Sequence, residues 1–149
     1  MNEVIDRQRH LLGVYAAYYE SLSPETVDQL ADLVTDDFVF CDPFTTVKGP
    51  KQVSSYLAKA FTDAENPSFV VTHRAVDGDM GFLRWHFSAK VPVIGQWDFT
   101  GMSEVTFNDD GTLLRSHTDH WDSGQKFYAK IPVLRWIIQR LARRVGSQG

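Results

Sequence analysis

The feature that most constrains the fold of this chain is a long stretch, residues 68–121, in which apolar and polar side chains alternate. A period of two is typical of β-strands that bury one face. Turn-forming residues interrupt the alternation at Asp77-Gly78-Asp79 and at Asn108-Asp109-Asp110-Gly111. The pattern therefore predicts a meander of antiparallel strands over Ser68–Val76, Met80–Val91, Trp97–Phe107 and Thr112–Trp121.

Two of these strands carry a mainly apolar face. On the second strand the face consists of Leu83, Trp85, Phe87 and Ala89. On the third it consists of Trp97, Phe99, Gly101, Ser103, Val105 and Phe107. A sheet with one apolar face needs other elements to cover that face, so we expect the helices of the chain to pack there.

The segments that flank the strands show the spacing of amphipathic helices. Ser23-Pro24-Glu25 and Pro50 are typical of helix starts, because proline fits the first turn and serine caps it. We expect helices over Glu3–Ser21, from Ser23 to about Val34, from Pro50 to Phe61, and after Gly124.

This order predicts an α+β, cone-shaped fold, in which three N-terminal helices pack on a strongly curved, mostly antiparallel β-sheet and a C-terminal helix follows. A curved sheet covered by helices encloses a cone that can hold a small molecule. We find no repeat and no linker, so residues 1–149 are predicted to form one domain, with 125–145 as a helical extension.

A short predicted strand, Phe38 to Asp42, places a carboxyl group at the point where the strand ends. Pro43 ends the strand because it has no N–H to donate. Phe38, Phe40 and Asp42 share one face. If that face lines a cavity, Asp42 is a candidate general base. The alternative is that Asp-Pro forms a simple turn and that Asp42 points to water.

Composition limits the function classes. The net charge of −4 argues against nucleic acid as a partner. A single cysteine, Cys41, excludes an internal disulfide and is typical of a reducing compartment. The charged start predicts no signal peptide, and no apolar run reaches the roughly 18 residues of a membrane span. We therefore expect a cytoplasmic protein.

The chain resembles the nuclear transport factor 2-like superfamily, and within it the SnoaL-like and ketosteroid isomerase-like branch. The resemblance covers roughly His10 to Ser123. It rests on Tyr15-Ala16-Ala17, Leu30-Ala31-Asp32-Leu33-Val34-Thr35-Asp36-Asp37, Phe40-Cys41-Asp42-Pro43, Val47-Lys48-Gly49-Pro50 and Phe107-Asn108-Asp109-Asp110-Gly111, in this order.

The resemblance implies roles for three residues. Asp42 matches the aspartate that shuttles a proton in the isomerases, and Tyr15 matches the tyrosine that donates to the substrate oxygen. Ser103 stands at the position of a second acid that shares the oxyanion. Serine is a weaker donor, and this departure argues against steroid isomerase activity. A pocket is thus expected to contain Asp42, Tyr15 and Ser103 with Phe40, Trp85, Phe87 and Phe99.

The last predicted strand is polar, and alternation divides it into two sets. Trp121 and Leu113 favour the set with His117 and Asp119 as the inner one. The register implied by the resemblance favours the other set, which places Thr118 and His120 in the pocket, with His120 near Asp42. An Asp–His pair is a plausible acid–base couple, and a dehydratase of similar fold combines aspartate, histidine and tyrosine. The alternative, which the sequence favours, is that His117 and His120 are hydrogen-bonded strand residues on a surface that faces water or another subunit.

These residues support two hypotheses. One is a pocket for a small apolar molecule with a polar oxygen, with isomerisation or dehydration by Asp42, Tyr15 and His120. The other is a non-catalytic ligand-binding or homo-oligomeric assembly module. We expect no metal, because His120 opposes His117 and Asp119, and no cofactor, because the chain lacks a phosphate-binding loop.

Two surfaces suggest partners. The open outer face of the sheet predicts a homodimer. The segment Tyr128 to Val145 is amphipathic and carries +5, which leaves −9 on the rest of the chain. We expect its apolar stripe to pack on the domain and close the open end of the cone. A basic helix on a membrane surface is the less favoured alternative.

Overall fold

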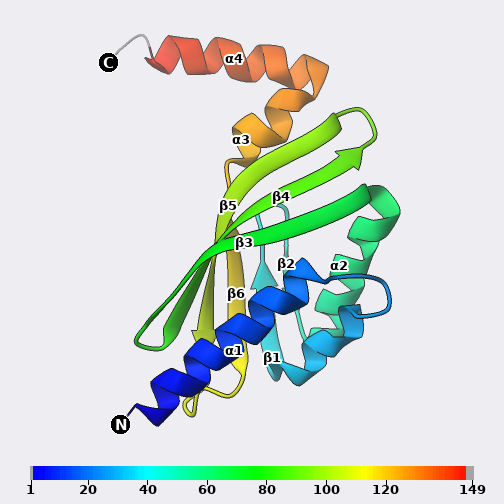
Figure 1. The fold of residues 1–149 in the computed structure, drawn as a ribbon. Helices are drawn as coiled ribbons and strands as arrows, with labels where there is room; N and C mark the ends of the chain where they lie inside the picture. Colours follow the sequence, from blue (N-terminus) through cyan, green and yellow to red (C-terminus); the bar gives the residue numbers. More distant parts are fainter. Residues whose placement is uncertain (1, 147–149) are drawn as a thin grey trace.

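A strongly curved six-stranded sheet organises the protein, which a computed structural model describes over residues 2–146 (Figure 1). Its strands are β1 (Val34–Cys41), β2 (Thr46–Lys48), β3 (Glu65–Asp77), β4 (Met80–Val91), β5 (Gly95–Phe107) and β6 (Leu114–His120). They lie in the order β2-β1-β6-β5-β4-β3, and β1 and β6 are parallel while the other pairs are antiparallel. The predicted α+β cone with a mostly antiparallel sheet is confirmed.

The long meander follows the predicted alternation closely. β4 has the predicted bounds, and the β3–β4 hairpin turns at Gly78, whose φ of +63° favours glycine. β3 begins earlier than expected, at Glu65. Its register shifts between Glu65 and Ser68, and Asn66 there has a φ of +51°, so the three added residues join the strand through a bulge.

Two full helices cover the concave face, and the segment between them is shorter than predicted. α1 spans Glu3–Glu20 and α2 spans Pro50–Asp63. The second predicted helix is a 3₁₀ helix, η1, over Val27–Asp32. Val27 and Leu30 are still buried together, because residues three apart lie on the same side of a 3₁₀ helix as well as of an α-helix. Val34 instead starts β1, where it pairs with Leu114.

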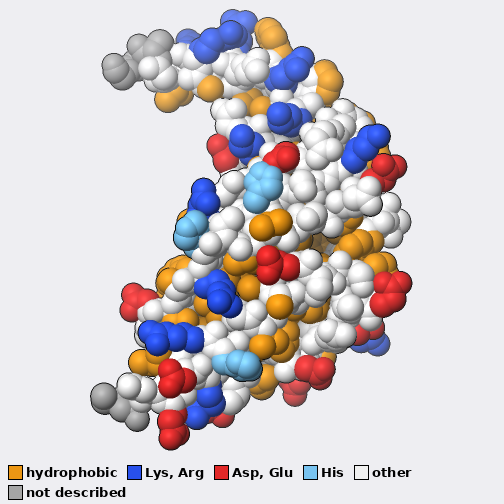
Figure 2. Space-filling view, viewed as in Figure 1, with side chains coloured by type: hydrophobic (Ala, Val, Ile, Leu, Met, Phe, Trp, Pro, Cys, Tyr) orange, Lys and Arg blue, Asp and Glu red, His pale blue; other side chains and the backbone are white. Residues whose placement is uncertain are grey.

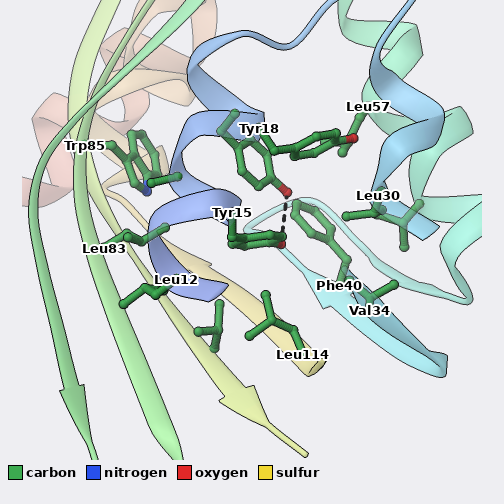
Figure 3. Packing of buried hydrophobic residues seen from close by; sticks show 14 of the residues in the cluster. Leu12, Tyr15, Tyr18, Leu30, Val34, Phe40, Leu57, Leu83, Trp85 and Leu114 are labelled. Carbon is green, nitrogen blue, oxygen red and sulfur yellow. Dashed lines mark hydrogen bonds between the residues drawn. The ribbon is translucent and has the colours of Figure 1, made fainter. Parts of the chain in front are cut away.

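The core lies between α1 and the inner face of the sheet (Figure 3). Leu12 and Tyr15 from α1 meet Leu83 on β4 and Leu114 on β6, and all four are almost completely buried. Burial of each such side chain contributes about 1.5–3 kcal/mol before entropy costs. These contacts hold α1 against the sheet and define one wall of the cone.

The C-terminal segment leaves the body of the molecule. It forms α3 (Ser123–Lys126), η2 (Tyr128–Lys130) and α4 (Pro132–Gly146). α4 projects away from the sheet and buries none of its residues (Figure 1). The prediction that its stripe closes the cone is therefore wrong. Phe127 instead packs at that end, against Phe44 and Trp97, with ring centroids 4.9 and 5.6 Å away.

Candidate functional site

An aromatic pocket of about 320 Å³ opens between the concave face of the sheet, β1 and α2. Four residues predicted for the pocket lie in its wall: Phe40, Trp85, Phe87 and Phe99. The aromatic wall also includes Phe44, Phe69, Trp97 and Trp121. Most of this surface is apolar, so the wall fits a ligand with a hydrocarbon body.

Asp42 lies in the pocket wall directly after β1, which ends at Cys41, one residue earlier than predicted, and starts four residues earlier, at Val34. Its Oδ1 accepts hydrogen bonds from the backbone N–H groups of Phe44 and Thr45, at 2.8 and 3.0 Å. Its Oδ2 accepts a hydrogen bond of 2.5 Å from the Tyr56 hydroxyl on α2. The turn after Pro43 therefore holds the carboxyl group, and α2 contributes a hydroxyl beside it.

A second carboxyl group, that of Asp119 on β6, also lines this pocket. Its Oδ1 accepts two short hydrogen bonds, from Ser103 Oγ at 2.5 Å and from His117 Nε2 at 2.6 Å. Within residues 2–146, Oδ2 of Asp119 has no hydrogen-bond partner. The protein thus holds one oxygen of this carboxyl group through two hydrogen bonds.

A chain of buried polar groups stands behind Asp119. The Nε1–H of Trp85 donates to Ser103 Oγ at 2.8 Å, so the serine hydroxyl joins the indole to the carboxyl group. On the other side, Tyr15 Oη lies 2.7 Å from Nδ1 of His117. With Nε2–H donating to Asp119, Nδ1 is the acceptor for the Tyr15 hydroxyl. His117 also stacks on Phe40, with centroids 4.8 Å apart.

Tyr15 is fully buried behind the pocket rather than in its wall. This corrects the prediction that the Tyr15 hydroxyl faces the ligand. The residue one helical turn later, Tyr19, lines the pocket, and its hydroxyl lies 3.3 Å from that of Tyr15. Burial raises the pKa of the Tyr19 phenol well above its ordinary value, so this hydroxyl stays protonated and able to donate.

Ser103 is likewise not in the wall of the main pocket. It is 2% exposed and lies directly opposite Asp119 in the β5–β6 register. Its hydroxyl therefore contacts the carboxyl group of Asp119 instead of facing the main pocket.

His120 and Thr118 lie on the opposite face of β6 from the pocket. His120 is exposed, and its Nε2 lies 3.0 Å from Oε1 of Glu104 on the convex side. Alternation allows only one of the two sets to face inward, and the pairing of β6 with β5 turns His117 and Asp119 in. The predicted placement of His120 near Asp42, and of Thr118 in the pocket, is wrong.

Tyr56 also lines the pocket, although nothing in the local sequence links it to Asp42, fourteen residues earlier. Burial, and then its hydrogen bond to Asp42, raise the pKa of the Tyr56 phenol above its ordinary value. For His117 and Asp119, the signal was present: they share a strand face with Trp121.

The rest of the pocket's charge is at its edge. Nζ of Lys59 on α2 lies 3.9 Å from Oδ2 of Asp63, and both side chains are mostly exposed. Over residues 2–146 no group of three histidine, cysteine, aspartate or glutamate side chains is placed to hold a metal ion. The described site is thus an apolar cavity with two carboxyl groups and two phenols.

Comparison with known proteins identifies the family of this chain. A family model described as the SnoaL-like domain matches residues 15–116. The chain belongs to the SnoaL-like domain family. The matched range contains Asp42 and Ser103 and ends before His117 and Asp119. A search of curated proteins found no match to the sequence.

Several solved structures are similar to this one. The BvnE pinacolase from Penicillium brevicompactum has a TM-score of 0.68 at 16% identity, over 95% of this chain and 97% of that one. An LEH-like epoxide hydrolase of M. tuberculosis has a TM-score of 0.65 at 10% identity, over 92% and 93%. A hypothetical protein from Catenulispora acidiphila, with a ketosteroid isomerase-like fold and bound trimethylamine, has a TM-score of 0.62 at 17% identity, over 82% and 92%. At these identities the likeness shows the fold, which several enzymes share.

Proposed function

We propose that this SnoaL-like domain binds a small, neutral, mostly apolar molecule with one polar oxygen and moves a proton on it. The observation that carries the proposal is that two carboxyl groups, Asp42 and Asp119, open into one aromatic pocket. A ligand with its own carboxylate is disfavoured there by like charge. A carbonyl or hydroxyl compound meets both hydrogen-bond donors and acceptors.

The arrangement supports proton transfer next to a carbonyl group. Asp42 would take a proton from the carbon beside the carbonyl and return it to a different carbon, which isomerises the ligand. Tyr19 would donate a hydrogen bond to the oxygen as negative charge develops on it. In its protonated form, Asp119 would share that oxygen through Oδ2, and the same set could assist loss of water from a hydroxyl compound.

Asp119 compensates for the missing second acid at position 103, where the serine argues against isomerase chemistry. The resemblance implies a second acid where this chain has Ser103. Asp119 is its direct neighbour across β5 and β6, and the two side chains are hydrogen-bonded. We infer that the acid is supplied from the adjacent strand, with Ser103 and His117 as positioning residues.

The test is hydrogen–deuterium exchange at the carbon next to the carbonyl of 1-indanone, followed by NMR in D₂O. The parent protein should speed exchange above the buffer rate. Asp42→Asn should lower the enzymatic rate by about 100-fold or more, which is the usual contribution of general base catalysis. Asp119→Ala and Tyr19→Phe should also lower it, because each removes a group that holds the oxygen.

His120→Gln is the matched control, since His120 is on the convex face, and it should leave the rate unchanged. Exchange by Asp42→Asn at the parent rate would contradict the proposed role of Asp42. If the parent binds 1-indanone, as read from tryptophan fluorescence, but does not speed exchange, the non-catalytic ligand-binding alternative is favoured.

A further inference from the structure

The C-terminal helix α4 is the largest feature that the proposed chemistry does not use. It packs against η2 and projects from the body of the molecule (Figure 1). None of its residues is buried. A fifteen-residue helix with no tertiary cover needs another source of stability, because most helices in proteins are stabilised by packing of an apolar face.

One side of α4 is a continuous apolar stripe. At 3.6 residues per turn, the large apolar residues fall on the same side of the helix: Leu134, Ile137, Ile138, Leu141 and Val145. Leu141 is 56% exposed and Val145 is 76% exposed. Large apolar side chains that are contiguous and uncovered mark a surface that binds something.

The charge around the stripe is entirely positive. Residues 123–146 contain six Lys and Arg residues and no acid. The first 122 residues hold the other nine cations and all nineteen acids, which gives −10. Arg135 and Arg144 border the stripe on its two sides, and Arg140 lies 5.5 Å from the ring of Trp136. Figure 2 shows Lys and Arg side chains gathered along α4 beside hydrophobic ones.

We propose that α4 docks on the surface of an anionic lipid bilayer, with its apolar stripe among the acyl chains and its arginines at the lipid phosphates. A helix with an apolar side and several basic residues binds such surfaces in two ways. Its apolar side is buried among the acyl chains, and its cations are attracted to the anionic lipids. Charge complementarity selects this partner, because a bilayer offers negative charge along both edges of an inserted helix. No helix within residues 2–146 is long and apolar enough to cross a membrane, so the attachment is peripheral.

The attachment also bears on the pocket. Phe127, in the segment that leads into α4, packs on Phe44 and Trp97, which both line the pocket. The Nε1–H of Trp97 donates to the backbone carbonyl of Lys126. A docked α4 would therefore keep the pocket rim close to the bilayer, from which an apolar ligand can enter. The docking itself does not depend on the proposed proton transfer.

The test is sedimentation of the full chain with vesicles of phosphatidylcholine alone or mixed with phosphatidylglycerol. The parent should pellet with the mixed vesicles and remain in solution with phosphatidylcholine alone, and added salt should release it. Leu141→Asp should lower binding by at least about tenfold, because it removes from the stripe a leucine that would insert among the acyl chains. Combined Arg135→Gln and Arg144→Gln should lower binding by about 25-fold, because these two arginines border the stripe.

Gln139→Asp is the matched control, because it adds the same charge to the side of α4 opposite Leu141, and it should bind much more tightly than Leu141→Asp. The proposal is overturned if the parent does not bind the mixed vesicles, or if Leu141→Asp binds like the parent. It is also overturned if the parent does not bind vesicles and forms a dimer that Leu141→Asp dissociates. The stripe would then pack against a second copy of the chain. Pocket variants such as Asp42→Asn should bind vesicles like the parent, which separates this test from that of the proposed function.

Discussion

Replacement of Ser103 by alanine should destabilise the protein far more than loss of one hydroxyl usually does. The Oγ atom accepts the Nε1–H of Trp85 at 2.8 Å and donates to Asp119 Oδ1 at 2.5 Å. The residue is 2% exposed, so water cannot replace the lost group. The variant therefore loses two buried hydrogen bonds and leaves an indole N–H without an acceptor.

The expected loss of stability is about 3 kcal/mol. Each of the two lost hydrogen bonds contributes about 0.5–1.5 kcal/mol, and a buried donor without a partner costs about 1–3 kcal/mol. These two effects overlap, so they do not add fully. For a domain of this size, a loss of about 3 kcal/mol corresponds to a decrease in Tm of about 6–12 °C.

Calorimetry at neutral pH would measure the change, with Ser116→Ala as the matched control. The Oγ of Ser116 bonds to Thr106 Oγ1 at 2.6 Å across the same two strands, but on the convex side and only half-buried. Its loss should cost less than about 1 kcal/mol, because water can replace it. In a Trp85→Phe background, Ser103→Ala should cost about 1–2 kcal/mol less, since no indole N–H is stranded. An equal cost in both backgrounds, or a Ser103 variant that melts like the parent, would refute this network.

Two further predictions concern alkaline pH and assembly. Burial raises the pKa values of Tyr15 and Tyr19 above 10.0 in the folded protein, so the folded state holds these protons to higher pH than the unfolded state does. The contribution of these two phenols to the free energy of unfolding in urea should therefore be constant below about pH 10 and fall above it, by up to about 1.4 kcal/mol per pH unit for each phenol. Tyr15→Phe should reduce that alkaline slope. The convex face, with Arg84 and the 47% exposed Met102, predicts a homodimer that Met102→Asp weakens. Light scattering that gives the 16.9 kDa mass of one chain across the micromolar range would contradict the dimer.

The fold class and most of the long helices and strands could be predicted from the sequence. The alternation of Leu83, Trp85 and Phe87 and the turn at Gly78 predicted a meander that the structure confirms, because both signals depend on a few adjacent residues. Pro50 marked the start of α2 for the same local reason. The end of the first strand also placed Asp42 where the pocket wall forms.

Only the tertiary structure decided which residues meet in the pocket. The polar strand β6 could present either set of side chains inward, and a one-residue difference in register exchanges the sets. The pairing of Asp119 on β6 with Ser103 on β5 determines which set faces inward. No local signal in the sequence encodes a partner sixteen residues away. The same holds for α4: its sequence determines an apolar stripe, but whether the domain covers that stripe depends on where Phe127 and Pro132 direct the chain, so the tertiary fold alone leaves it exposed.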